Sequence, residues 1–242
     1  MRILNKYYAF KDKSRNLRNS EFKLLGNINF NNKNYPLFRI DINSKIKNPS
    51  LCFSAAIHGN ESSGVSGILK WLENNNISRK INYRLYPITN PYGYHFFRRT
   101  NHKRINLNRE FKKENPEKEI KLIKTDLRNK LFNIFISFHE NSTKDKEDFY
   151  IYSYPNKNSI DFSKYILRNI SNNVIIDERK IIDGYKAKNG LIIDDMESSF
   201  EFYMGDNNAK VSICVEIPSK ISIKQRTDIA KDIIILTEKF YL

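Results

Sequence analysis

The sequence is poor in the features that mark secreted and membrane-bound proteins. Its 242 residues include two cysteines, Cys52 and Cys214, which are too few for a disulfide framework. Each lies in an apolar run, as buried small hydrophobic residues do. No stretch approaches the roughly 18 consecutive apolar residues of a membrane span, and no apolar segment follows the charged start of the chain as in a secretory signal. We therefore expect a cytoplasmic protein with no membrane partner.

Acidic residues are outnumbered by basic ones. The chain has 42 Lys and Arg against 27 Asp and Glu, which gives a formal net charge of +15. A surplus of this size is typical of nucleic-acid-binding proteins. However, the basic residues are scattered, and the densest patch, residues 97–104, has no nucleic-acid motif around it. We therefore expect no nucleic acid as the primary partner, and 40% hydrophobic residues are enough for a packed core.

Linkers and internal repeats are also missing, and strand and helix patterns alternate along the chain. Short apolar runs predict strands at residues 51–57, 82–88, 132–138, 149–152, 174–176 and 211–217, after a hairpin at 27–42. Apolar residues three or four apart predict helices at residues 65–73, 117–127, 160–170 and 223–240, whereas the polar stretch 177–208 predicts a long loop. This alternation indicates a single α/β domain with helices on both faces of a sheet. Residues 1–45 are expected to form an N-terminal hairpin region packed on residues 46–242.

Only four histidines are present, and two of them follow predicted buried strands. His58 comes directly after residues 51–57, and His139 after residues 132–138. The carboxyl ends of core strands are where α/β sheets build their sites. Glu61 lies three residues after His58 at the expected start of a helix, so both side chains face the same way. Two imidazoles and one carboxylate with an open fourth position are typical of a catalytic zinc site. Taken alone, His58 is better interpreted as a capping or core-edge histidine and His139 as one that closes a strand.

Further motifs follow in a characteristic order. Asn90-Pro91-Tyr92-Gly93 comes after a predicted strand, and Asn106-Leu107-Asn108-Arg109 comes after Arg99. Glu216 lies in an apolar strand, where a carboxylate is costly unless it is paired, bound to metal or catalytic. With the two histidine segments, this order resembles the zinc carboxypeptidase A family, and within it the short bacterial branch of murein peptide amidase A. The resemblance runs from about Leu51 to Pro218.

The resemblance implies a zinc carboxypeptidase-like fold, in which three α/β/α layers surround a central mixed, twisted sheet. It also implies one Zn²⁺ per chain, with three ligands: His58, Glu61 and His139. Glu216 matches the general base of the family. Arg99 matches the arginine that stabilises the oxyanion, with Arg98 as a competitor for that role.

Substrate-binding residues follow from the same resemblance. Asn108 and Arg109 match the pair that binds the free α-carboxylate of the substrate. Tyr185 matches a mobile tyrosine that closes over the substrate, and Tyr203 is the alternative. The base of the side-chain pocket is expected between residues 192 and 197, where acidic residues predict a cationic group on the substrate: Asp194, Asp195 and Glu197.

One position departs from the family pattern. The family usually has Asp-Leu-Asn-Arg, in which the Asp orients the first zinc histidine, whereas this chain has Asn106. An Asn carbonyl still accepts a hydrogen bond from His58, but without the charge. Loss of such an outer carboxylate typically costs about 10–100-fold in metal affinity or activity. We therefore expect this chain to retain zinc less tightly than its relatives.

The resemblance predicts a zinc-dependent metallopeptidase that hydrolyses an amide bond next to a free terminal carboxylate of a small peptide. The bacterial branch implies a cell-wall-derived (murein) peptide, cut between D-glutamate and a diamino acid. Two alternatives stay open: an N-acyl amino acid deacylase of the desuccinylase/aspartoacylase type, and a non-catalytic basic binding module on the same fold. Stoichiometric zinc is expected for both enzymes and not for the binding module.

Overall fold

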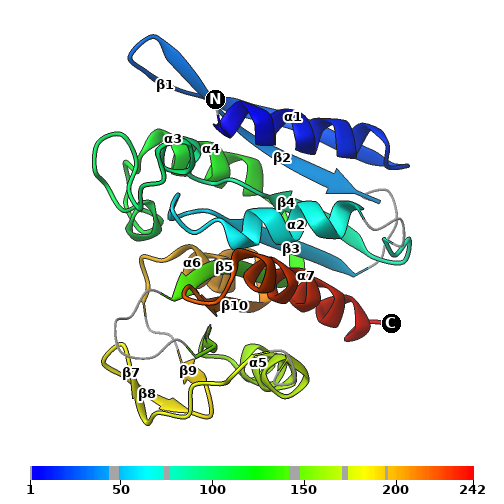
Figure 1. The fold of residues 1–242 in the computed structure, drawn as a ribbon, viewed down its shortest axis with the longest axis vertical. Coiled ribbons are helices and arrows are strands. Elements are labelled where there is room, and N and C mark those ends of the chain that lie inside the picture. The colour runs from blue at the N-terminus through cyan, green and yellow to red at the C-terminus, as the bar shows by residue number, and fades with distance from the viewer. Residues whose placement is uncertain (1, 44–48, 74–76, 142–147, 171–173, 194–195) are drawn as a thin grey trace.

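Ten strands form one mixed sheet in the computed structural model, which describes residues 2–43, 49–73, 77–141, 148–170, 174–193 and 196–242. The strands are β1 Ser20–Phe30, β2 Lys33–Ile42, β3 Ser50–Ala55, β4 Asn82–Tyr86, β5 Phe132–Asn141, β6 Tyr150–Ser153, β7 Ile181–Ile182, β8 Tyr185–Lys188, β9 Leu191–Ile193 and β10 Ala209–Pro218. Their order across the sheet is β1-β2-β4-β3-β5-β10-β6-β9-β8-β7 (Figure 1). Strands β4, β3, β5 and β10 run parallel to one another. The antiparallel pairs are β1 with β2, β2 with β4, and β6 with β10.

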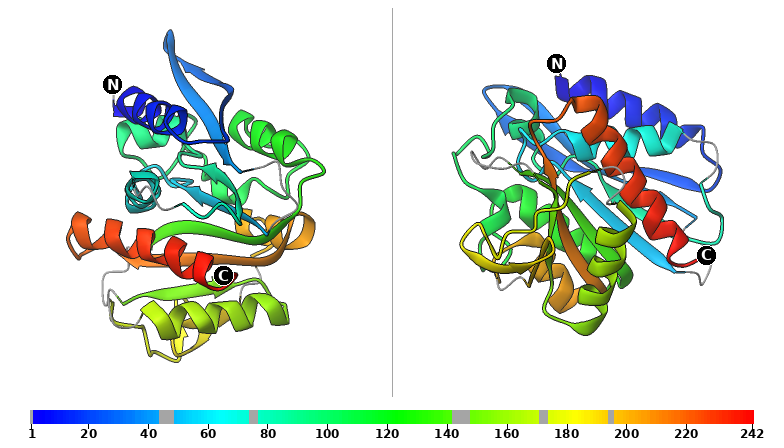
Figure 2. Two further views of the ribbon diagram at one scale, coloured as in Figure 1. Left: turned by 90° about the vertical axis from the view of Figure 1, so that its right-hand side faces the viewer. Right: turned by 60° about the horizontal axis from the view of Figure 1, so that its bottom comes forward.

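Helices cover both faces of this sheet. The helices are α1 Arg2–Arg15, α2 Ser63–Glu73, α3 Pro91–Phe96, the 3₁₀ turn η1 Leu107–Arg109, α4 Lys118–Leu127, α5 Lys157–Ile170, α6 Phe200–Asn207 and α7 Ile223–Lys239. One side carries α1, α2, α5 and α7, and the other carries α4 and α6 (Figure 2). Each layer has its own apolar cluster, with Trp71 and Phe162 in the first and Ile120 and Phe200 in the second. The predicted three-layer α/β/α fold with a mixed sheet is therefore confirmed.

Most predicted elements are confirmed, and two predictions about type are wrong. Residues 174–176 form no strand, because only an isolated bridge between Phe149 and Ile176 pairs this segment. The stretch 177–208 contains β7, β8, β9 and α6 rather than a single loop. These strands are only two to four residues long and lie at the end of the sheet, so each is too short to stand out as a strand pattern in the sequence.

The N-terminal region differs from the prediction by one added helix. Residues 27–42 form the expected hairpin, whose turn residues Asn31 and Asn32 both have positive φ, as a two-residue hairpin turn requires. The preceding helix α1 is mostly polar and buries only a few side chains, among them Ile3 and Phe10. Its periodicity was therefore too weak to predict it. The hairpin joins the main sheet because β2 pairs with β4. That residues 1–45 and 46–242 form one domain stays a prediction.

The parallel centre of the sheet sets the position of the candidate site. Strands β3 and β5 are neighbours, and β5 is also the neighbour of β10. The chain segments that leave their carboxyl ends therefore meet at one edge. Across the described ranges, no helix has the length and apolar character needed to cross a membrane.

Candidate metal centre and cavity

His58 lies in the turn after β3, which packs closely against the backbone of α3. Ala56 has a positive φ, and a Cβ added at Gly59 would lie 2.0 Å from the backbone carbon of Gly93 in α3. Glycine at position 59 therefore lets this turn pack directly on the backbone of α3. This contact fixes His58 between the two segments.

The Asn-Pro-x-Gly motif builds the other side of this contact. Asn90 caps α3, since its side-chain oxygen accepts a hydrogen bond from the Gly93 backbone N–H at 2.8 Å. Pro91 occupies the first turn of the helix, where no backbone donor is needed. A Cβ on Gly93 would lie 2.4 Å from Asn90 Nδ2, so glycine is required there too. The motif thus serves as a rigid support for the turn that contains His58.

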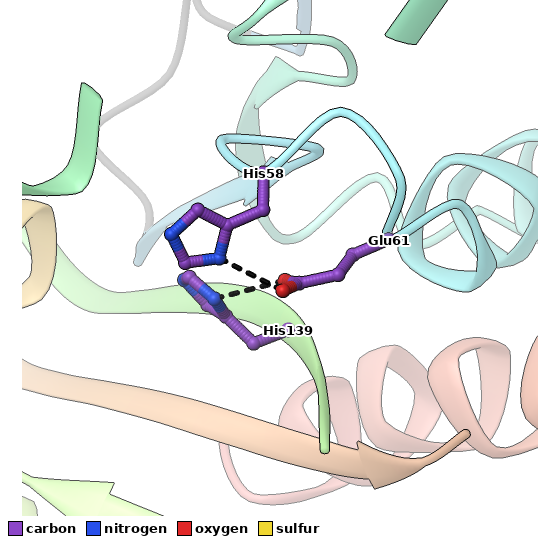
Figure 3. Close-up of side chains that lie close together, drawn as sticks. All are labelled: His58, Glu61 and His139. Atoms are coloured by element: carbon purple, nitrogen blue, oxygen red, sulfur yellow. Dashed lines mark hydrogen bonds and ion pairs between the residues drawn. The ribbon is translucent and has the colours of Figure 1, made fainter. Parts of the chain in front are cut away.

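His58, Glu61 and His139 converge on one buried point (Figure 3). The Nδ1 atom of His58 lies 2.8 Å from Glu61 Oε1, and the Nδ1 atom of His139 lies 3.0 Å from Glu61 Oε2. One ligand atom from each residue lies within 4.8 Å of the others. Two imidazole nitrogens and one carboxylate are the donor set of a catalytic zinc ion. The residues present therefore fit a zinc ion, and both histidines offer it the same ring nitrogen.

The electrostatics of this triad favour a cation between its members. Burial alone would raise the pKa of Glu61, but the two histidines hold it well below its usual range. Burial lowers the pKa of His139, but the Glu61 carboxylate outweighs this and raises it to about 9. For His58, burial lowers the pKa despite the neighbouring carboxylate. An ionised carboxylate thus shares a buried site with two imidazoles, which is an arrangement that a metal ion stabilises.

Two side chains contact the triad from outside. Asn106 Oδ1 lies 3.1 Å from His58 Nε2, and it also accepts a hydrogen bond from the Asn108 backbone N–H at 3.0 Å. Arg99 donates to Glu61 Oε1 at 3.0 Å, and its side chain is about half exposed. Asn106 therefore orients the His58 ring. Arg99 faces both the triad and the solvent.

A cavity of about 260 Å³ opens beside the triad. Its wall contains these residues: His58, Arg99, Asn108, Arg109, His139, Tyr152, Asp183, Tyr185, Met196, Glu201, Cys214 and Glu216. Glu216 in β10 is the register partner of His139 in β5. Burial raises the pKa of Glu216 to about 8, although the nearby His139 acts in the opposite direction. The eight residues predicted to form a site therefore lie at the triad or on this cavity, while their roles stay predictions.

The predicted competitors lie elsewhere. Arg98 is exposed and does not contribute to this cavity, whereas Arg99 does. Tyr203 packs on Phe111 in the apolar cluster on the α4 and α6 side of the sheet, whereas Tyr185 lines the cavity. The geometry therefore favours Arg99 and Tyr185 in both pairs.

The side chain of Asn108 has a structural task in addition to the predicted one. Its oxygen accepts a hydrogen bond from the Phe200 backbone N–H at 2.9 Å, and its Nδ2 donates to Glu201 Oε1 at 3.2 Å. Asn108 thus holds the start of α6 against the cavity. One amide hydrogen is left for a substrate, so Arg109 is the stronger candidate for binding a carboxylate.

Of the three acidic residues predicted at the substrate pocket, only Glu197 is among the described residues, and it does not line the cavity. Asp194 and Asp195 lie outside the described residues, and Glu197 forms an ion pair with Lys112 away from the cavity. Two carboxylates that the sequence analysis missed line it instead: Glu201, which is buried, and Asp183. Glu201 lies in an apolar stretch, and this is the signal that had already singled out Glu216. Asp183 accepts hydrogen bonds from two tyrosines and carried no sequence signal.

Comparisons with known proteins agree with this fold. The family profile described as the succinylglutamate desuccinylase/aspartoacylase catalytic domain matches residues 47–157. No curated protein sequence matches the chain. Among solved structures, a candidate metallopeptidase of Shewanella baltica is 25% identical with a TM-score of 0.84, over 99% of this chain and 92% of that one. A candidate metallopeptidase of Shewanella amazonensis is 22% identical with a TM-score of 0.84, over 99% of this chain and 93% of that one.

A more distant structure has a named activity and a ligand. A metallo-carboxypeptidase of Pseudomonas aeruginosa, in complex with (2-guanidinoethylmercapto)succinic acid, is 13% identical with a TM-score of 0.73. The match covers 98% of this chain and 68% of that one. The chain thus has the fold of these metallopeptidase and metallo-carboxypeptidase structures. Fold and triad together define a candidate metallo-hydrolase.

Proposed function

We propose that this protein is a zinc-dependent metallopeptidase that hydrolyses an amide bond next to a free terminal carboxylate of a small peptide. The observation that carries the proposal is the shared cavity: the buried His58–Glu61–His139 triad opens onto the same space as Glu216 and Arg109. When bound, zinc supplies a Lewis acid and an activated water molecule. The remaining chemistry depends on the side chains of this chain.

Glu216 is the proposed proton carrier. Its raised pKa of about 8 lies near neutrality, where a carboxyl group both accepts and returns a proton readily. The carboxylate takes a proton from the attacking water and passes it to the nitrogen of the leaving amine. Its strand pairing with His139 keeps that transfer within the cavity.

Two arginines bind the charged parts of the substrate. Arg99 stabilises the oxyanion that forms on the scissile carbonyl, since its guanidinium already lies beside Glu61. Arg109 uses one nitrogen to bond the Asn108 carbonyl at 2.8 Å, and its other N–H groups can bind the terminal carboxylate. Tyr185 closes the cavity over the bound peptide.

A murein-derived peptide, cut between D-glutamate and a diamino acid, is the proposed substrate. The Glu201 and Asp183 carboxylates of the cavity suit the ammonium group of a diamino acid. The net charge of +15 would attract acidic peptides toward the protein. A cytoplasmic location, without a nucleic acid or a membrane as partner, is part of the same proposal.

One observation favours a second function. The family profile that matches residues 47–157 is that of desuccinylases and aspartoacylases, which supports an N-acyl amino acid deacylase. Both enzymes need the metal triad and an arginine for a carboxylate, so the site alone does not separate them. Hydrolysis of muropeptides should be compared with that of succinyl- and acetyl-amino acids. Faster cleavage of the acyl-amino acids would favour the deacylase.

The metal and two matched variants test the proposal as a whole. We expect about one zinc per purified chain, and loss of activity on removal and its return on addition. Glu216→Gln should keep zinc and lose about 10²–10⁴-fold in kcat, as expected for a general base. Arg99→Ala should lose about 10²–10³-fold in kcat, whereas the neighbouring Arg98→Ala should change it little. A protein that neither holds nor regains zinc would instead support the non-catalytic binding module.

A further inference from the structure

A second group of metal-binding side chains lies on the other side of the His139 ring. His139, Glu201 and Cys214 each offer a ligand atom within 4.8 Å of the others, and all three residues are buried. The Nε2 atom of His139 lies 3.9 Å from Glu201 Oε1. This group uses the opposite ring nitrogen from the one that faces Glu61. It is therefore distinct from the triad and shares one residue with it.

The fold holds this group in place from three elements. Cys214 lies two residues before Glu216 in β10, so both side chains point to the same face of the strand, toward the cavity. Glu201 lies in the first turn of α6, where Asn108 bonds one of its oxygens. His139 lies in β5, the neighbour of β10. No movement of a helix or strand is needed to bring the three ligand atoms together.

Two polar atoms of this group lack hydrogen-bond partners. Within the described part of the chain, His139 Nε2 and Glu201 Oε2 are buried and form no hydrogen bond. Leaving a buried polar group unsatisfied costs stability. A ligand bound between them would remove that cost. Because a thiol, an imidazole and a carboxylate surround the same point, the ligand that fits is a metal ion with affinity for sulfur.

We propose that His139 Nε2, Glu201 and Cys214 form a second metal position, which takes Cd²⁺ or excess Zn²⁺ and blocks the cavity. Binding displaces the proton of the Cys214 thiol and the proton on His139 Nε2, and both are released to solvent. With zinc also in the triad, the imidazole of His139 would offer one ring nitrogen to each ion. The second position is weaker than the triad, since its ligands lie farther apart and it must deprotonate two groups.

The spectrum of a metal–thiolate bond tests this proposal directly. The zinc-loaded protein is titrated with Cd²⁺ while the ultraviolet charge-transfer absorption of cadmium–thiolate is recorded. We expect a saturable band with an end point of one Cd²⁺ per chain. Exchange of Cd²⁺ into the triad gives no such band, because His58, Glu61 and His139 contain no sulfur. The readout is independent of any enzymatic activity, so failure of the proposed function leaves it intact.

The two cysteines provide matched variants. Cys214→Ser should abolish the band, whereas Cys52→Ser should keep it, since Cys52 lies in β3 within the apolar cluster under α4 and is in neither metal-ligand group. Glu201→Gln should weaken Cd²⁺ binding at least tenfold while keeping the thiol. A band that survives in Cys214→Ser, or a wild-type protein that gives no band at excess Cd²⁺, would overturn the proposal.

A second readout addresses the blocked cavity. Fluorescence or calorimetric titration with a small dicarboxylate should show at least tenfold weaker binding to the cavity once the second position is filled. In Cys214→Ser the same Cd²⁺ concentration should leave dicarboxylate binding unchanged. Equal dicarboxylate affinity with and without Cd²⁺ in the wild-type protein would contradict the blocking role.

Discussion

Replacement of Asn106 by aspartate should tighten zinc binding. In the wild-type protein, Asn106 Oδ1 contacts His58 Nε2 at 3.1 Å and the Asn108 backbone N–H at 3.0 Å. An aspartate keeps both contacts and adds a charge to the acceptor. Hydrogen bonds to charged groups contribute about 1.5–3 kcal/mol against about 0.5–1.5 kcal/mol for neutral ones. The gain is therefore about 1–1.5 kcal/mol, or roughly tenfold in the dissociation constant.

This estimate lies at the lower end of the range for outer metal contacts. Losses of such carboxylates cost about 10–100-fold in affinity or activity. Asn106 is partly exposed, so water screens part of the added charge. Zinc affinity is best measured by competition with a chelator of known affinity, at fixed pH and ionic strength.

Asn106→Ser is the matched control for this measurement. Serine can still cap the 3₁₀ turn by accepting from the Asn108 N–H, but its side chain is too short to reach His58. The expected order of zinc affinity is therefore aspartate, asparagine, then serine. An Asn106→Asp protein that binds zinc no more tightly than wild type would refute the argument that this contact tunes the metal site.

Two further predictions concern stability. Burial raises the pKa of Glu119 to about 7, so the folded state keeps a proton that the unfolded state loses between about pH 4.5 and 7; the free energy of unfolding should fall across this window by up to about 3 kcal/mol. Glu119→Gln should remove that dependence, as measured by urea titrations of both proteins at pH 4.5 and 8. An equal fall in the free energy of unfolding between these pH values in the two proteins would contradict the prediction. Glu140 accepts a hydrogen bond from the Ser63 N–H at 2.6 Å and pairs with Arg226, so Glu140→Gln should lose about 2–4 kcal/mol of stability at pH 7. The double variant Glu140→Gln/Arg226→Ala should lose less than the sum of the two single changes, and an additive loss would argue against a coupled pair.

The sheet centre and the triad could be predicted from the sequence because their signals are local. Strands β3, β5 and β10 are largely apolar, and a charged or histidine residue that interrupts or follows such a run stands out. His58, His139 and Glu216 were found in this way. Parallel strands then bring their carboxyl ends together as a matter of topology, which is why the expected site matches the observed cavity.

Short or partly exposed elements gave no comparable signal. Helix α1 is mostly polar, and β7 to β9 are strands of two to four residues in a stretch that looks like a loop. Such elements form because they pair or pack with segments far away in the sequence. The prediction for Glu197 rests on distance along the sequence alone, whereas its side chain pairs with Lys112 away from the cavity.

By itself, the sequence determined the layered α/β fold, the triad and its neighbour Glu216, because hydrophobic periodicity and strand ends depend on local order. Only the tertiary structure shows that Arg99 and Tyr185 line the cavity whereas Arg98 and Tyr203 do not, since no local pattern tells which side chains share one space. It also brought Glu201 and Cys214 to the far side of the His139 ring. These residues come from α6 and β10, and their distance from His139 is set by strand pairing and by the contact of Asn108 with α6, which no local pattern encodes.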